Sequence, residues 1–129
     1  MAEYHEPVEE LDAGTRDYHR AIKSLMEELE AVDWYQQRVA TATDEELRRI
    51  LAHNRDEEIE HACMVLEWLR RNMPGWEENL RTYLFQDPAV SIVAIEQDAE
   101  QGEASTEPAV KPGPNPGATQ DLGIGTLKE

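Results

Sequence analysis

Two long stretches of the chain repeat their apolar side chains at alternating steps of three and four residues, a spacing that places them on one face of an α-helix. The first stretch extends from near Pro7 to about Ala40, and the second from Glu45 to about Asn72. The positions that share a face are Tyr18, Ala21, Leu25, Glu28, Val32, Tyr35 and Val39, and then Leu47, Leu51, Asn54, Glu58, His61, Val65 and Trp68. The spacing predicts an all-α chain built on two long antiparallel helices that are joined by a short turn.

The remaining residues predict less regular structure. Thr43 or Asp44 is expected to cap the second helix. The segment 72–75 (Asn-Met-Pro-Gly) should end it, and a short third helix is expected from Trp76 to Gln86. The sequence indicates no particular conformation for residues 87–96. The predicted domains are a helical domain over 1–96, a disordered or polyproline-like linker over 97–120, and a terminal peptide over 121–129.

The charge of the chain restricts its partners. Its 28 acidic and 12 basic residues give a formal net charge of −16. Nucleic acids and anionic lipids should therefore be repelled, whereas cations should be attracted. No apolar run is long enough to span a bilayer, and a single cysteine, Cys63, cannot build a disulfide framework within the chain. These features predict a soluble, cytoplasmic protein.

Both helical stripes are interrupted by polar side chains at the same distance from the turn. Glu28 lies 15 residues before Thr43, and Glu58 lies 15 residues after it. In an antiparallel pair these positions reach the same level, so Glu28 should face Glu58 and His61, which share a face because they are three residues apart. Unpaired carboxylates at core positions cost several kcal/mol, a cost that a shared cation would offset. The interruptions therefore predict a metal site, with a solvated acidic face as the alternative.

The ligand types favour iron or manganese, since carboxylate oxygens and an imidazole suit these ions and Cys63 lies off the His61 face. Carboxylate di-iron proteins use one Glu from each of two helices and Glu-x-x-His from each of two others. This chain supplies half of that set. A second copy related by a two-fold axis would supply the other half and complete a four-helix bundle. Four carboxylates would then balance two Fe²⁺ ions, which makes a ferroxidase at a dimer interface the leading interpretation.

Other acidic and aromatic residues surround these three positions. The acidic ones could attract cations or be ordinary solvent-facing charges, and the two interpretations are equally favoured. The aromatic ones could supply electrons to the site, although packing at an interface is the more common role. The acidic residues are Glu27, Glu30, Asp33, Glu57 and Glu60, and the aromatic residues are Trp34 and Tyr35.

The segments HRAIKSLMEELEAVDWYQQRV (19–39) and LAHNRDEEIEHACMVLEWLRRN (51–72) closely resemble the encapsulated ferritins. The resemblance covers most of residues 8–95 and implies a ferroxidase with a di-iron centre shared between two chains of an annular decamer. It also implies roles for individual residues. They are Glu28, Glu58 and His61 as iron ligands, Glu27 and Glu30 as metal-uptake acids that could also hold calcium or other divalent ions, and Trp34 and Tyr35 as aromatics near the centre.

The end of the chain, DLGIGTLKE (121–129), places apolar side chains after a polar segment. Leu122, Ile124 and Leu127 could enter a groove on a partner. The sequence LGIGTLK resembles the peptide by which encapsulin shells capture cargo, which implies targeting through Leu122, Gly123, Ile124, Gly125 and Leu127. The resemblance therefore implies iron storage within an encapsulin nanocompartment in the cytoplasm.

Three other functions remain open at this point. The first is a di-iron oxygen or peroxide reductase of rubrerythrin type, although the chain has no CxxC pair of the kind that rubredoxin-like partners carry. The second is a non-catalytic metal-binding protein. The third is a helical adaptor whose acidic stripe is only structural.

Overall fold

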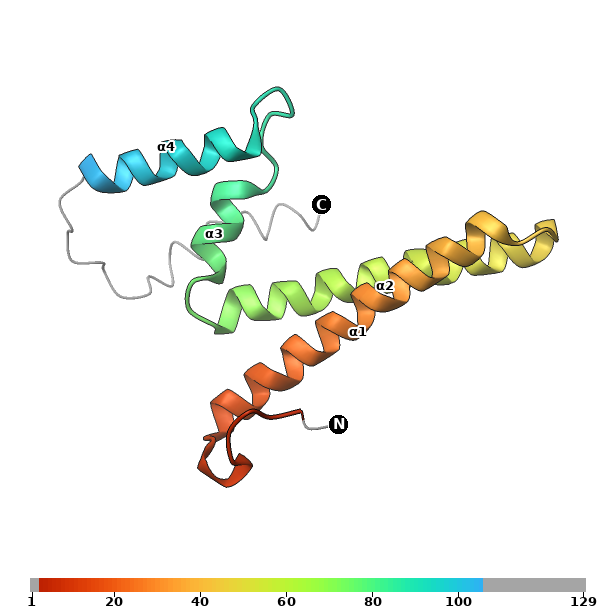
Figure 1. Ribbon diagram of the computed structural model, residues 1–129, viewed down its shortest axis with the longest axis horizontal. Coiled ribbons are helices and arrows are strands. Elements are labelled where there is room, and N and C mark those ends of the chain that lie inside the picture. The colour runs from red at the N-terminus through yellow and green to blue at the C-terminus, as the bar shows by residue number, and fades with distance from the viewer. Residues whose placement is uncertain (1–2, 106–129) are drawn as a thin grey trace, which may run out of the picture. The chain divides into compact units, whose positions relative to one another are not determined.

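The computed structural model describes residues 3–105, which fall into two compact units, 3–84 and 85–105. The first unit contains the 3-10 turn η1 (Val8–Glu10) and the helices α1 (Ala13–Thr41), α2 (Glu45–Asn72) and α3 (Trp76–Tyr83). The second contains α4 (Ile92–Ser105). Residues 3–105 contain no strand, so the prediction of an all-α chain is confirmed (Figure 1).

Helices α1 and α2 form an antiparallel hairpin whose ends are set by acidic caps. The carboxylate of Asp12 accepts a hydrogen bond of 2.7 Å from the backbone N–H of Thr15, and that of Asp44 accepts one of 2.9 Å from Leu47. Such caps satisfy backbone donors that have no partner within the helix. The two helices lie side by side near their connection and diverge toward the other end of the hairpin (Figure 1).

The caps explain which of the predicted helix boundaries agree with the structure. Helix α2 has the predicted bounds, and Asp44, not Thr43, caps it. Helix α1 does not begin near Pro7, because Asp12 caps it and residues 8–10 form a separate turn. Helix α3 ends at Tyr83 and not at Gln86, and Phe85 beyond it has a positive φ of 61°, which an α-helix cannot contain.

Helix α3 is held against the hairpin by polar contacts. The indole N–H of Trp76 donates a hydrogen bond of 2.7 Å to the hydroxyl of Tyr18 on α1. The guanidinium of Arg70 on α2 forms ion pairs with Glu67 at 2.7 Å and with Glu77 on α3 at 3.2 Å. These contacts connect the end of α2 and the start of α1 to the short helix.

The hairpin has almost no interior of its own. Among the described residues only Ala62 and Leu69 are buried, whereas eight large apolar side chains on the two long helices are more than one third exposed. Two helices and one short third helix cannot enclose a core, so much of the apolar surface of the hairpin stays exposed in this chain. The exposed apolar residues of the hairpin are Met26, Leu29, Trp34, Leu47, Ile50, Ile59, Met64 and Trp68.

Helix α4 corrects the expected linker. The sequence predicts an irregular segment from residue 97, but the chain is helical from Ile92 to Ser105. Ser91 accepts a hydrogen bond of 3.1 Å from the N–H of Ala94 at the start of this helix. Residues 97–105 contain no proline, and Ala, Gln and Glu are good helix formers, so a helix is favoured there. The rest of the predicted linker and the peptide 121–129 lie outside the described residues.

None of the helices within residues 3–105 is long and apolar enough to cross a membrane.

Candidate metal centre

Glu28 on α1 and Glu58 and His61 on α2 converge midway along the hairpin. His61 Nδ1 lies 3.1 Å from Glu58 Oε1 and 3.6 Å from Glu28 Oε1. One ligand atom from each of the three residues lies within 4.8 Å of the others, so the three could hold one metal ion. The equal distance of Glu28 and Glu58 from the turn therefore predicted their meeting correctly.

The cluster is open on one side. The side chains of Glu28 and Glu58 are 26% and 24% exposed, and that of His61 is 46% exposed. Because these side chains keep part of their contact with solvent, the desolvation cost of the cluster is smaller than that of a fully buried site. Three donor groups also leave coordination positions free on a six-coordinate ion, so further ligands must come from outside this chain or from solvent.

The two carboxyl groups titrate together because they are close to each other. The pKa of Glu28 is raised, first by its hydrogen bond with Glu58 and then by partial burial and the negative charge of Glu58. The pKa of Glu58 is lowered, chiefly because it accepts the hydrogen bond from Glu28. The proximity of the two carboxyls thus makes ionisation of Glu28 less favourable, an effect that a bound cation would offset.

The imidazole of His61 responds to the same carboxylates. Its pKa is raised, first by the hydrogen bond to Glu58 and further by the charges of Glu28, Glu58 and Glu57. A protonated imidazole cannot bind a metal ion, so the raised pKa makes a proton a stronger competitor with a metal ion for His61. The negative charge of the cluster thus favours any cation, either a proton or a metal ion.

The predicted outer acids lie on the surface around this cluster but do not join it. Glu27, Glu30, Glu57 and Glu60 are exposed, and no ligand-distance group of three within residues 3–105 includes them. Two other contacts occupy part of this surface. Asp33 accepts a hydrogen bond of 3.1 Å from Gln37, and Glu57 lies 3.6 Å from His53. The positions fit an acidic approach to the cluster and equally fit solvated charges.

The two aromatic residues have different environments. Tyr35 is half-buried, and the guanidinium of Arg38 stacks over its ring at 5.2 Å from the ring centre. Trp34 is 49% exposed and lines a separate shallow hollow with Gln37, Arg38 and Thr41. Sequence reasoning missed the role of Arg38, although its spacing of three residues from Tyr35 is the signal for such a contact.

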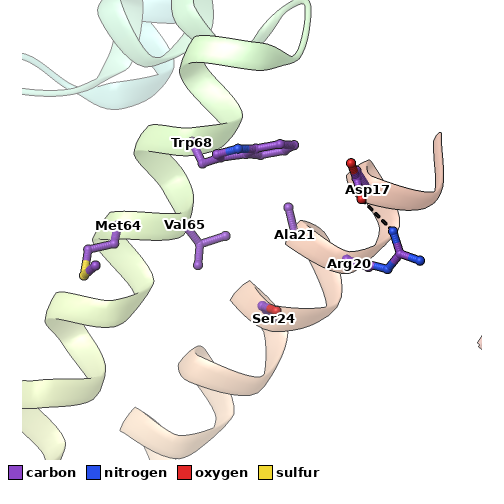
Figure 2. Close-up of a pocket in the computed structure, with 7 residues that line it drawn as sticks. All are labelled: Asp17, Arg20, Ala21, Ser24, Met64, Val65 and Trp68. Carbon is purple, nitrogen blue, oxygen red and sulfur yellow. Dashed lines mark hydrogen bonds and ion pairs between the residues drawn. The ribbon is translucent and has the colours of Figure 1, made fainter. Parts of the chain in front are cut away.

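A groove lies between the two helices toward the diverging end of the hairpin. It has a volume of about 480 Å³ and lies one helical turn beyond the site, since Ser24 precedes Glu28 by four residues and Val65 follows His61 by four. Figure 2 shows Val65 and Trp68 pointing from α2 toward Ala21 on α1, with a gap between them. The helical stripe predicts packed contacts here, but the divergence of the helices leaves the groove open. Its lining comprises Asp17, Arg20, Ala21, Ser24, Met64, Val65 and Trp68.

Two long antiparallel helices that carry a carboxylate–carboxylate–imidazole cluster define a ferritin-like protein. More narrowly, the chain belongs to the EncFtn-like family, whose family model matches residues 3–87. The resemblance to encapsulated ferritins is thus confirmed.

Individual relatives agree with this assignment. A "Ferritin-like protein" from Thermotoga maritima is 61% identical over 104 residues, which cover 81% of this chain and 90% of the relative. An "Encapsulated ferritin-like protein" from Rhodospirillum rubrum is 58% identical over 124 residues, covering 96% of this chain and 86% of the relative. The crystal structure of protein ne0167 from Nitrosomonas europaea is 57% identical, with a TM-score of 0.66, and the match covers 70% of this chain and all of that one.

Proposed function

We propose that this protein is a ferroxidase that oxidises Fe²⁺ to Fe³⁺ with O₂ at a di-iron centre shared between two copies of the chain. The observation that carries the proposal is the convergence of Glu28, Glu58 and His61 on one open face of the hairpin. The printed name of the Rhodospirillum rubrum relative, an encapsulated ferritin-like protein, supports it.

The second copy is proposed because one chain supplies only half of a di-iron ligand set. A two-fold axis beside His61 would bring a second set of the same three residues to the open side of the cluster. Four carboxylates carry a formal charge of −4, which two Fe²⁺ ions neutralise. The same axis would let the partner cover the groove that Val65 and Trp68 line.

The chemistry follows from having two irons side by side. Each Fe²⁺ gives up one electron, so a pair supplies the two electrons that reduce O₂ to the level of hydrogen peroxide. The chain's residues hold the ions and handle protons. Ions that bind here displace any proton on Glu28 or His61, whose pKa values are both raised, and the carboxylates then stabilise the higher charge of Fe³⁺.

Delivery of iron to the cluster is proposed to use the surface acids. Glu27, Glu30, Glu57 and Glu60 flank the three ligands, and a chain with a net charge of −16 concentrates cations at its surface. Hard divalent ions such as Ca²⁺ would bind the same carboxylates. Trp34 and Tyr35 lie within two turns of Glu28 and are proposed to shape the surroundings of the centre.

Iron storage is proposed to take place within an encapsulin nanocompartment in the cytoplasm, where the chain assembles as a decameric ring. The segment 121–129, which lies outside the described residues, would be the targeting peptide. It would bind the shell through Leu122, Gly123, Ile124, Gly125 and Leu127. An open ring oxidises iron but cannot enclose a mineral, so a surrounding shell supplies the volume for storage.

The test is aerobic oxidation of Fe²⁺ by the purified full chain, followed by the absorbance of Fe³⁺ and by O₂ uptake. We expect oxidation well above the rate in buffer, with the same rate for a chain that lacks 121–129. Co-expression with an encapsulin shell should retain the full chain and release the shortened one.

Other results of these measurements would indicate another function. Iron binding without faster oxidation would indicate a metal buffer, and rapid consumption of hydrogen peroxide that depends on an added electron donor would indicate a reductase. Either outcome contradicts the proposed activity.

A further inference from the structure

The chain before α1 folds back along that helix. Asp12 caps α1, and residues 3–11 lie beside its first turns and run in the opposite direction (Figure 1). The guanidinium of Arg16 donates a hydrogen bond of 2.5 Å to the backbone carbonyl oxygen of Val8, which holds the middle of this segment to the helix. We call residues 3–11 the N-terminal arm.

The beginning of the N-terminal arm reaches two side chains on α1. The carboxylate of Glu3 lies 3.4 Å from the ammonium of Lys23 and 4.0 Å from Nε2 of His19. The ring of Tyr4 packs against the imidazole of His19, with 4.5 Å between the ring centres. Within residues 3–105, the ammonium of Lys23 pairs with Glu3 and with no other carboxylate. The N-terminal arm therefore determines where the positive charge of Lys23 is held.

Lys23 lies on the same side of α1 as the two acids proposed to take up metal ions. Glu27 follows Lys23 by four residues and Glu30 follows it by seven, spacings that place all three in one row along the helix. Both carboxylates are exposed, so a cation in solution can approach them. An unpaired ammonium one turn away would repel such a cation, or would bind Glu27 in its place.

We propose that Glu3 is a positioning residue for metal uptake, which binds the ammonium of Lys23 and prevents that charge from opposing the approach of Fe²⁺. This inference rests on the proposed uptake role of Glu27 and Glu30. The stacking of Tyr4 on His19 keeps the carboxylate of Glu3 within reach of Lys23. The pair is 40% and 43% exposed, and exposed ion pairs contribute little to stability, so its effect is on the charge beside the uptake acids and not on the fold.

The test compares how the oxidation rate depends on Fe²⁺ concentration in the wild-type full chain and in Glu3→Gln, at low ionic strength. The Fe²⁺ concentration that gives half the maximal rate should rise about 3- to 10-fold in Glu3→Gln, because an unpaired charge then acts on a divalent ion about one helical turn away. The maximal rate should stay unchanged, since no ligand of the cluster is altered. At an ionic strength of about 0.5 M the difference should fall below about 2-fold, because salt screens exposed charges.

Two further variants separate this effect from a simple loss of negative charge. Glu6→Gln removes the same charge from another exposed position of the N-terminal arm, and it should leave the half-saturating Fe²⁺ concentration within about 2-fold of the wild-type value. Glu3→Gln combined with Lys23→Gln removes both partners and should restore the wild-type value. An equal shift in Glu3→Gln and Glu6→Gln would overturn the proposal, and so would a double variant that keeps the shift of Glu3→Gln.

Binding of Mn²⁺, followed by the electron paramagnetic resonance signal of the free ion, gives a readout that needs no oxidation. The affinity of the metal-free full chain for Mn²⁺ should be lower in Glu3→Gln and restored in the double variant. This pattern in a wild-type chain that does not oxidise Fe²⁺ would overturn the proposed ferroxidase activity and still support the role of Glu3. Equal Mn²⁺ affinities in wild type and Glu3→Gln would overturn the role of Glu3 itself.

Discussion

Glu28 and Glu58 illustrate how a site can be prepared for a cation before one arrives. A hydrogen bond between the two carboxyls raises the pKa of Glu28 and lowers that of Glu58, and both lie near the same imidazole nitrogen. A cation at the same place would be attracted by both carboxylates. The residues whose pKa values are shifted are thus the residues proposed to hold iron.

For single residues, the most informative substitution is Glu58→Gln, which keeps the shape of the side chain and removes its charge. We expect it to lower the rate of Fe²⁺ oxidation at least about 100-fold, since a neutral amide is a poor ligand for iron. Asp56→Asn, two residues away, makes the same charge change at a carboxylate that is 64% exposed and that, within residues 3–105, pairs only with Arg55. Stopped-flow absorbance should show a nearly normal rate for it, and equal losses in the two variants would mean that net charge, not ligation, controls oxidation.

At the scale of the elements, the short helix α3 depends on a charged network at the end of α2. The guanidinium of Arg70 lies between Glu67 and Glu77, and Arg71 also donates to Glu67. The side chain of Arg70 is only 10% exposed, so the carboxylates of Glu67 and Glu77 compensate for a largely buried charge. The network fixes the direction in which the chain leaves the hairpin.

Glu67→Gln should destabilise the metal-free protein by about 1 kcal/mol at neutral pH, a modest value because Glu67 is 40% exposed and solvent screens its charge. Hydrogen bonds from Arg70, and then from Arg71, lower the pKa of Glu67 from 4.5 to about 2. A lowered pKa stabilises the fold above pH 4.5, and that contribution is lost as the pH falls toward 2. Urea unfolding at several pH values should show the difference between wild type and variant shrinking across this interval; a constant difference would contradict the assignment.

The sequence predicts the elements unevenly, for physical reasons. The bounds of α2 and the meeting of Glu28 with Glu58 follow from caps and from helical spacing, which are local properties. The groove beside Trp68 could not be predicted, because the divergence of two helices depends on their crossing angle and not on the spacing of either one. Helix α4 was missed because polar residues such as those after Ile95 suit a linker and a solvated helix equally.

At the scale of the whole molecule, the half-set of ligands predicts a simple stoichiometry. We expect two irons for every two chains, so anaerobic Fe²⁺ binding should saturate at about one ion per chain. The mass should rise above that of the metal-free species as the ions fill the site, because without them like charges face each other across the axis. Native mass spectrometry measures both quantities, and two ions bound tightly to a monomer would contradict the shared centre.

The opening of the Glu28–Glu58–His61 cluster to solvent would also make the proposed oxidation sensitive to dilution. If neither chain holds a complete centre, the number of working centres grows with the square of the chain concentration whenever that pairing is weak. A freely diffusing protein would then lose specific activity as it is diluted, whereas copies confined in a small volume stay at a high effective concentration. Confinement would therefore sustain the proposed activity itself, in addition to retaining its product.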